Sequence, residues 1–314
     1  MGEPTHGDLD GDGVDDTALF LGHDPGGSGT FYYVAVALRR GNGYRGTNAV
    51  LLGDRVAPET LVVRNGVLIA GYVDRRAGEP MSASPTVRAT AYLVLQGTEL
   101  VAIAVTGSGS PPGEAVREGW LTIGREARSF SPCGEKKTLR VSGEAPVLAE
   151  LRDACRRALP DTGPYTPLFA VVAGRYGARP GDGFGAQYDG SFLATRLVRV
   201  WPRGNCRSEH VVLEEPTPGQ AFTSPLTLRG RARGTWFFEG DFPIELRDAR
   251  GGIVARHYAT ARGEWMTQDF VPFEGTLEFP KPERPQPGTL VLRKYNPTDS
   301  PARDDAVEIP VMFR

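Results

Sequence analysis

The sequence of 314 residues has only three cysteines, four histidines and four lysines. With no CxxC pair and no closely spaced histidines, it offers no Cys/His metal site. No apolar run approaches the roughly 20 residues that a membrane helix needs. The charge is nearly balanced, with 36 basic and 38 acidic residues and a formal net charge of −2, which argues against a nucleic-acid partner.

Glycine and proline, in contrast, are abundant, at 40 and 26 residues. Both residues mark turns, and short apolar runs lie between them along most of the chain. The length suffices for two or three domains, and a hydrophobic content of 40% does not indicate disorder. The sequence therefore predicts a mainly β, multi-domain protein with antiparallel sheets.

The stretch from Asp8 to Asp16 has the most specific chemistry of the chain. It places aspartates at positions one, three, five and nine of a loop and a glycine, Gly13, at position six. Ca²⁺ takes about six to eight oxygen ligands in a flexible shell, and glycine permits the sharp reversal because it has no Cβ. We expect a structural Ca²⁺ site made of four carboxylates and one backbone carbonyl: Asp8, Asp10, Asp12, Asp16 and the carbonyl of Val14.

This loop differs from an EF-hand, because Leu19 occupies the position of the bidentate glutamate that ends an EF loop. The DxDxDGxxD pattern, followed by the apolar segment 17–22, instead resembles the calcium loops of FG-GAP and dockerin-like repeats, which are often extracellular. Only one copy occurs, so a propeller is not expected. A solvated acidic turn without metal is the alternative interpretation. His6 and His23 flank the loop and are expected to be surface residues.

Residues 1–107 are predicted to form a β domain that begins with the calcium loop. Asn65-Gly66 between two apolar runs predicts a tight hairpin, since both central residues of a type I′ turn need positive φ. Residues 41–46 match the dinucleotide pattern GxGxxG, but a strand-like run follows where a helix is required, so no nucleotide site is expected. We expect strands at residues 17–22, 30–38, 48–52, 59–64, 67–73, 87–96 and 99–105. Residues 51–86 resemble a module of uncharacterised bacterial lipoproteins and envelope proteins, and this resemblance implies a location without implying any chemistry.

A glycine-, serine- and proline-rich linker is predicted at residues 107–113. Residues 115–208 then read as a second, small β domain with strands at 119–124, 137–141, 168–176 and 192–201. The chain's one helix is expected from Pro146 to Leu159, because proline suits a first helical turn. Leu148, Leu151, Cys155 and Leu159 share one face of it. The segments 130–134 and 165–174, with this helix between them, resemble the small META/NlpE-like β domains of bacterial envelope lipoproteins.

Three cysteines allow three single bridges. Cys155 lies on the apolar helix face, where a buried and inert thiol is expected. Cys133 and Cys206 bracket the middle domain, each near a turn glycine. We predict a Cys133–Cys206 disulfide, on the condition that the protein is exported.

Residues 209–314 are predicted to form an immunoglobulin-like β-sandwich. About seven short strands with turn signals between them are typical of that architecture, with runs at residues 211–214, 224–232, 237–248, 270–279 and 288–295. The order and wording of these runs resemble the immunoglobulin-like domain of bacterial spore-germination (Gmad) proteins, which implies an exported binding module. Its aromatic residues could form a binding face, but core packing is the preferred interpretation: Trp236, Phe237, Phe238, Phe242, Trp265, Phe270 and Phe273.

Taken together, these features predict a non-enzymatic, calcium-stabilised binding or scaffold protein of the bacterial cell envelope. Its expected partner is an envelope protein or a cell-wall glycan. One alternative is a hydrolase of envelope polymers, for which the available groups share no motif spacing: Asp182, Asp189, Glu209, His210 and His257. A second alternative is a structural component of a surface layer or appendage, assembled by pairing of edge strands.

The expected location is the periplasm or the cell surface. The sequence shows no signal peptide, although Met1-Gly2 lies close to the predicted calcium loop. We expect that a secretory or lipoprotein signal is absent from this sequence. Any attachment to a membrane would then depend on such a removed lipid anchor.

Overall fold

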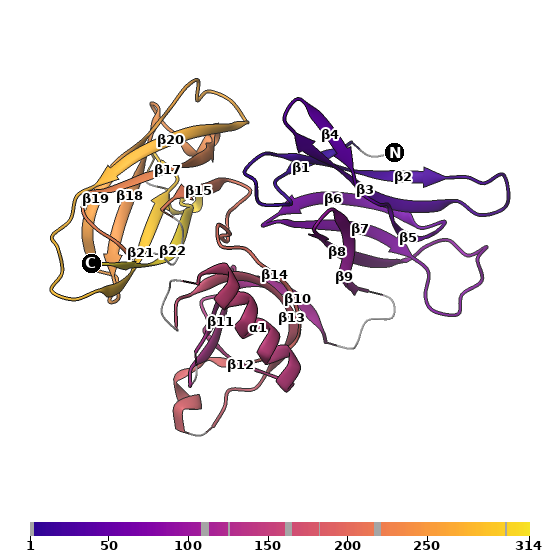
Figure 1. Ribbon diagram of the computed structural model, residues 1–314, viewed down its shortest axis with the longest axis horizontal. Helices are drawn as coiled ribbons and strands as arrows, with labels where there is room; N and C mark the ends of the chain where they lie inside the picture. Colours follow the sequence, from indigo (N-terminus) through magenta and orange to yellow (C-terminus); the bar gives the residue numbers. More distant parts are fainter. Residues whose placement is uncertain are drawn as a thin grey trace.

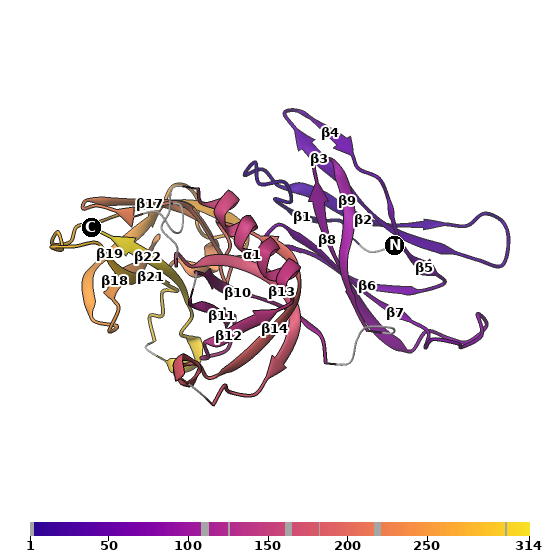
Figure 2. The ribbon, with the colours of Figure 1, turned by 60° about the horizontal axis from the view of Figure 1, so that its bottom comes forward.

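The computed structural model describes residues 3–107, 113–124, 126–160, 165–181, 183–216, 221–298 and 300–314. Most of the predicted linker, at 108–112, and Asp182 lie outside these residues. Antiparallel β-sheets dominate, and the described residues contain one α-helix, as the sequence predicts. The chain forms an N-terminal unit (β1–β9), a barrel (β10–β14) and a C-terminal unit (β15–β22), which Figures 1 and 2 show side by side.

The N-terminal unit consists of two sheets. The first has the order β1-β2-β3-β4, with β5 also paired to β3, and the second has the order β6-β7-β8-β9. Apolar side chains from both sheets, among them Phe20, Val36, Leu68 and Leu93, pack between them in one core. The strands are β1 (Thr5–Gly7), β2 (Asp16–His23), β3 (Phe31–Arg40), β4 (Gly43–Gly46), β5 (Val50–Asp54), β6 (Ala57–Arg64), β7 (Val67–Asp74), β8 (Val87–Gln96) and β9 (Glu99–Thr106).

Two turn assignments in this unit can be compared directly with the sequence. Asn65 and Gly66 have φ values of 50° and 68° and join β6 to β7, so the predicted tight hairpin is confirmed. The GxGxxG segment forms the turn and the short strand β4, which pairs antiparallel with β3. No helix follows the glycines, as expected for an ordinary hairpin.

The middle unit is a closed five-stranded barrel with the order β10-β11-β12-β14-β13. Its elements are β10 (Ala115–Ile123), β11 (Arg128–Pro132), β12 (Leu139–Gly143), α1 (Ala145–Ala158), β13 (Leu168–Gly177) and β14 (Gly190–Val200). β12 and β14 pair in parallel, while β10 and β13 close the barrel antiparallel. A helix between the third and fourth strands of such a barrel gives the connectivity of the OB-fold, a five-stranded Greek-key barrel.

The helix begins and ends within one residue of the prediction and has a proline in its first turn. Leu151 is fully buried in the barrel core, beside Phe130 and Phe192. Cys155 packs against the same core, and burial raises the pKa of its thiol to about 11. The thiolate is therefore scarce near neutral pH, which agrees with an inert thiol.

Cys133 and Cys206 form a disulfide, which confirms the predicted pair. Cys133 follows β11 directly, and Cys206 lies in the segment that leads from β14 to the C-terminal unit. The bond therefore fastens this connecting segment to the wall of the barrel.

The C-terminal unit is a β-sandwich built from one continuous sheet. The order is β15-β17-β20-β19-β18-β21-β22-β16, and β19 pairs with both β18 and β20, so it connects the two layers. Of the seven aromatic residues considered above, Trp236, Phe237, Phe242 and Phe273 are buried, and Phe238 is 37% exposed. The strands are β15 (Val211–Glu215), β16 (Ala221–Phe222), β17 (Leu226–Arg233), β18 (Asp241–Asp248), β19 (Ile253–Ala261), β20 (Phe270–Leu277), β21 (Gln286–Arg293) and β22 (Ala306–Phe313).

The three units meet around a buried polar cluster. The Asn65 side chain donates to Glu118 of β10 at 2.9 Å and to the backbone oxygen of Asn205 at 3.2 Å. Asn205 in turn donates from its side chain to the carbonyl of Val211 in β15 at 2.9 Å. Arg64 forms an ion pair with Glu118 at 3.0 Å. One small set of side chains therefore joins the N-terminal hairpin, the barrel and the first strand of the sandwich.

Apolar contacts extend this junction. Valine and alanine side chains on the outside of the barrel pack against the second N-terminal sheet, for example Val116 and Val171 against Val67 and Val94. Trp120, on the outside of β10, packs against the core of the sandwich. No helix in the described ranges is long and apolar enough to cross a membrane.

Candidate metal centre

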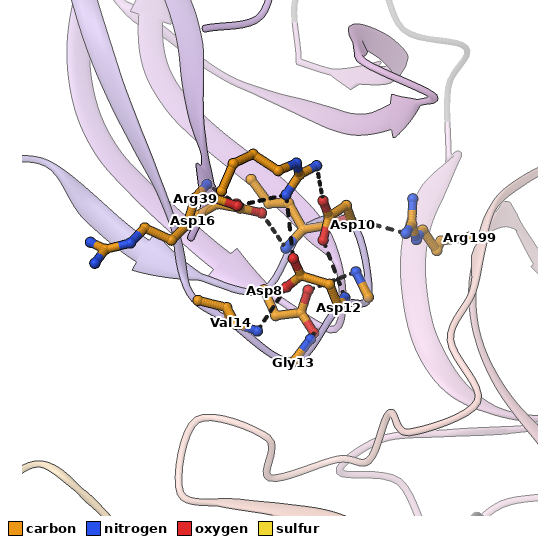
Figure 3. A network of polar contacts seen from close by, with 11 residues as sticks. Asp8, Asp10, Asp12, Gly13, Val14, Asp16, Arg39 and Arg199 are labelled. Atoms are coloured by element: carbon orange, nitrogen blue, oxygen red, sulfur yellow. Dashed lines mark hydrogen bonds and ion pairs between the residues drawn. The ribbon is translucent and has the colours of Figure 1, made fainter. Parts of the chain in front are cut away.

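The aspartate loop connects β1 to β2 at the end of the first N-terminal sheet. Gly11 and Gly13 have φ values of 90° and 86°, which glycine adopts readily. The loop curls around Asp8, whose two carboxylate oxygens accept hydrogen bonds from the backbone N–H groups of Gly11 at 2.6 Å and Gly13 at 3.0 Å. Figure 3 shows this turn with its aspartates gathered on the inner side.

Asp16 forms the floor of the loop. Its side chain is fully buried, and its oxygens accept the N–H groups of Leu9 at 3.1 Å and Arg39 at 2.9 Å. Leu9 itself is buried in the core of the N-terminal unit. The hydrophobic packing of Leu9 therefore anchors a carboxylate-lined turn to a rigid sheet.

Three of the four predicted carboxylates converge. Asp8, Asp10 and Asp16 each offer an oxygen, and these three oxygens lie within 4.8 Å of one another. Burial is the largest cause that raises the pKa of Asp8, and the neighbouring charges of Asp10 and Asp12 raise it further. Burial likewise raises the pKa of Asp16 above its ordinary range. The arrangement therefore disfavours full ionisation by itself, and a cation among the oxygens would relieve the repulsion.

Asp12 and Val14 lie differently. One oxygen of Asp12 accepts the N–H of Val14 at 2.8 Å, and the other lies 3.3 Å from Arg40. Arg40 also contacts Asp10 at 2.5 Å, so one guanidinium already offsets part of the negative charge. Val14 is about half exposed. The contribution of Asp12 and of the Val14 carbonyl to a metal site stays a prediction.

Residues from the other two units approach the loop from outside. Arg199 of β14 donates to the carbonyl oxygen of Leu9 at 3.1 Å, and its guanidinium lies 4.5 Å from the ring centroid of Trp201. The Trp201 ring would lie 3.4 Å from a Cβ at Gly11. Arg231 of β17 reaches Asp15 at 4.0 Å. Sequence reasoning missed all these partners, because they lie far along the chain and no local pattern marks them.

The groups considered for a hydrolase do not gather in the described part of the chain. Asp189 accepts the backbone N–H of Thr138 at the end of the barrel. His210 stacks on Trp236 at the junction, whereas His257 is exposed on β19. Asp182 lies outside the described residues.

Comparison with known proteins identifies one part of the chain. Residues 210–301 match a domain family described as Gmad2, the immunoglobulin-like domain of bacterial spore germination. This match confirms the expected immunoglobulin-like domain at the C-terminal end. A search of curated proteins and a search of solved structures gave no match.

Proposed function

We propose that the chain is a non-enzymatic, calcium-stabilised binding or scaffold protein of the bacterial cell envelope. The observation that carries this proposal is the convergence of Asp8, Asp10 and Asp16, one of them fully buried, in a loop that the other units contact. The resemblance of the loop to FG-GAP and dockerin-like calcium loops supports the same conclusion.

The donor set suits Ca²⁺. All three converging groups are carboxylates, and hard cations such as Ca²⁺ prefer oxygen ligands. Each carboxylate keeps lone pairs beyond the backbone hydrogen bonds that it accepts. Asp8, Asp10 and Asp16 would hold the ion, with Asp12 and the Val14 carbonyl as further ligands. Bound Ca²⁺ would supply positive charge to the turn and so stabilise the fold.

Export is supported by two observations. The disulfide between Cys133 and Cys206 is of a kind that persists in oxidising compartments, and the C-terminal domain belongs to a family of bacterial immunoglobulin-like domains. The resemblance of the middle unit to META/NlpE-like envelope domains points to the periplasm or the cell surface. An envelope protein or a cell-wall glycan is the partner that this location favours.

Calorimetric titration with Ca²⁺ and thermal unfolding in Ca²⁺ or chelator test the proposal. We expect binding at one site and a higher unfolding temperature with Ca²⁺, because a ligand at 100 times its Kd stabilises the native state by about 2.7 kcal/mol. Asp16→Asn should abolish both effects. Asp24→Asn, which changes an aspartate outside the loop, should leave both unchanged.

Two results would count against the proposal. Equal unfolding temperatures in Ca²⁺ and chelator, together with no heat of binding, would remove the calcium site. Turnover of peptidoglycan or ester substrates that is lost when one carboxylate is changed would replace the binding protein by an enzyme.

A further inference from the structure

The barrel buries two of its sides against the other units and leaves a third side free. The outer surface of β10 and β13 packs on the second N-terminal sheet through Val116, Val171 and Ala173. Trp120 and Phe169 meet at 5.4 Å on the side that faces the sandwich. In Figure 1, β12 lies on the side of the barrel that points away from both neighbours.

We call this third side the free face and define it by strand register. Ser129 of β11 pairs with Arg140 of β12, and Arg140 pairs with Ser191 of β14. In the next row, Ser142 pairs with Leu193, and Leu193 pairs with Arg175 of β13. Residues that pair directly point to the same side of a sheet. The free face therefore consists of Ser129, Arg140, Ser142, Arg175, Ser191 and Leu193.

Its outward orientation follows from the alternation along the strands. Leu139, Val141, Phe192 and Ala194 alternate with these residues and are buried in the barrel core. Arg140, Ser142, Arg175 and Leu193 are exposed. The free face thus combines hydroxyl groups with two guanidinium groups around a single apolar side chain.

The two arginines of the free face carry uncompensated charge. Throughout the described ranges, no acidic group lies within ion-pair distance of Arg140 or Arg175. The acidic side chains at this end of the barrel are engaged elsewhere. Asp189 accepts the N–H of Thr138, and Glu135 accepts the hydroxyl of Tyr176.

Arg140 is also positioned from above. A Cβ at Gly185, in the connection between β13 and β14, would lie 3.3 Å from Nη1 of Arg140. The absence of a side chain at Gly185 therefore lets this connection approach the guanidinium closely. In OB-fold barrels generally, the second and third strands and this fourth connection are the parts that bind oligomeric ligands. Here those strands are β11 and β12.

We propose that the free face binds an anionic glycan, through ion pairs from Arg140 and Arg175 and hydrogen bonds from the serine hydroxyls. Guanidinium groups match carboxylate and phosphate oxygens in geometry as well as charge. The serines offer donors and acceptors that suit sugar hydroxyls. This inference rests on the proposed envelope location, and it specifies which partner the protein contacts and where.

The composition of the free face favours a glycan over a nucleic acid. Proteins that bind single-stranded nucleic acid stack bases on aromatic side chains, and the six residues of the free face include no aromatic ring. A net charge of −2 also provides no long-range attraction for a polynucleotide.

Calorimetric titration of the full chain with defined oligomers tests the inference. The probes are an oligogalacturonate with a carboxylate on every sugar, a polyol-phosphate polymer of the teichoic type and a neutral malto-oligosaccharide. We expect binding of an anionic probe that weakens as salt is added, and no binding of the neutral one. The stronger of the two anionic probes identifies the natural charge as carboxylate or phosphate.

Variants locate the site. Arg140→Gln together with Arg175→Gln should weaken binding of the anionic probe about tenfold or more, because each loses a charge-assisted hydrogen bond. Arg45→Gln is the matched control: it removes one exposed arginine from β4, in the N-terminal unit, and should leave binding unchanged. Both proteins should unfold at the temperature of the unaltered chain.

The outcomes separate this inference from the proposed function. If the chain binds Ca²⁺ but neither anionic probe, the glycan site is wrong and the calcium-stabilised protein stands. If the double variant binds as well as the control, the location is wrong. If oligothymidylate binds more tightly than both anionic glycans and loses affinity in the double variant, the ligand class is wrong.

Discussion

Arg199 of the barrel donates a hydrogen bond to the carbonyl oxygen of Leu9 in the aspartate loop, over 3.1 Å. Leu9 lies between two of the proposed metal ligands, Asp8 and Asp10. Burial lowers the pKa of Arg199, while the charges of these two aspartates oppose that effect. The barrel therefore takes part in holding the loop, although every proposed ligand belongs to the N-terminal unit.

Replacing Arg199 should loosen the loop. Arg199→Met keeps most of the apolar volume but loses a charge-assisted hydrogen bond to a backbone carbonyl, which contributes about 1.5–3 kcal/mol. We expect a lower free energy of unfolding in urea and faster hydrogen exchange at the amides of residues 9–16. Arg45→Met serves as the control. Unchanged exchange in the loop would show that the barrel does not restrain it.

Gly66 should be far less tolerant of substitution than other glycines with positive φ. A Cβ there would lie 2.5 Å from ring atoms of Trp201, and φ is already +68°. Gly66→Ala combines an unfavourable backbone conformation with overpacking, so we expect a loss of about 3 kcal/mol. Gly78→Ala, at φ +86° with open space around it, should lose only about 1 kcal/mol. Equal losses in thermal unfolding would contradict the close contact with Trp201.

Removing the disulfide should weaken both the barrel and the junction. The bond spans 73 residues, and closing such a loop stabilises the folded state by about 4 kcal/mol in the chain-entropy model. In Cys133→Ser with Cys206→Ser, the neighbouring Asn205 loses its tether. We expect a lower free energy of unfolding and protease cleavage between the barrel and the sandwich.

Cys155→Ala is the control for this experiment, because it removes the third cysteine without affecting the bond. If the double variant resists protease as well as this control does, the disulfide has no part in ordering the connecting segment.

Glu245 of β18 should make the sandwich sensitive to acid. Its side chain is 1% exposed and pairs with Arg247 at 2.6 Å and Arg256 at 2.7 Å. Burial raises the pKa of Glu245, but the two arginines outweigh burial and hold it below its ordinary value of 4.5. A carboxyl group with a lowered pKa in the folded state stabilises that state above its unfolded pKa, and this stability is lost as pH falls.

We therefore expect the free energy of unfolding to fall as pH drops below about 4.5. Glu245→Gln should cost about 2 kcal/mol at neutral pH, less than for a fully enclosed pair because the arginines reach water. It should also flatten the acid limb of the stability curve measured in urea. Parallel curves for the variant and the unaltered chain would exclude this role. Glu308→Gln, an exposed change on the neighbouring strand β22, is the control.

Local patterns in the sequence predicted the local features well. Asn65-Gly66 specified its hairpin because few other residue pairs adopt two positive φ values. Pro146 and the four apolar positions of α1 specified the helix. The Cys133–Cys206 pair could be chosen because the third cysteine lay on an apolar helix face.

Features that depend on distant residues were not predicted. β11 is short and alternates serine with one phenylalanine, so its hydrophobic signal is weak. The parallel pairing of β12 with β14, which closes the barrel, joins residues about fifty positions apart. β19 and β22 were also missed, although they complete the sandwich. The carboxylates of the candidate site were visible as a pattern, but Arg40 and Arg199 became neighbours only through folding.

The bond between Cys133 and Cys206 also sets the route that tension would take through the chain. A pull between the N-terminal unit and the sandwich would pass along β10 and β11 and then cross the sulfur atoms to residue 206. Helix α1 and strands β12, β13 and β14 lie in the covalent ring that this route bypasses. In a molecule stretched between the cell and a surface, roughly 250 Å of chain, at about 3.4 Å per residue, would stay coiled inside the ring and could not pay out.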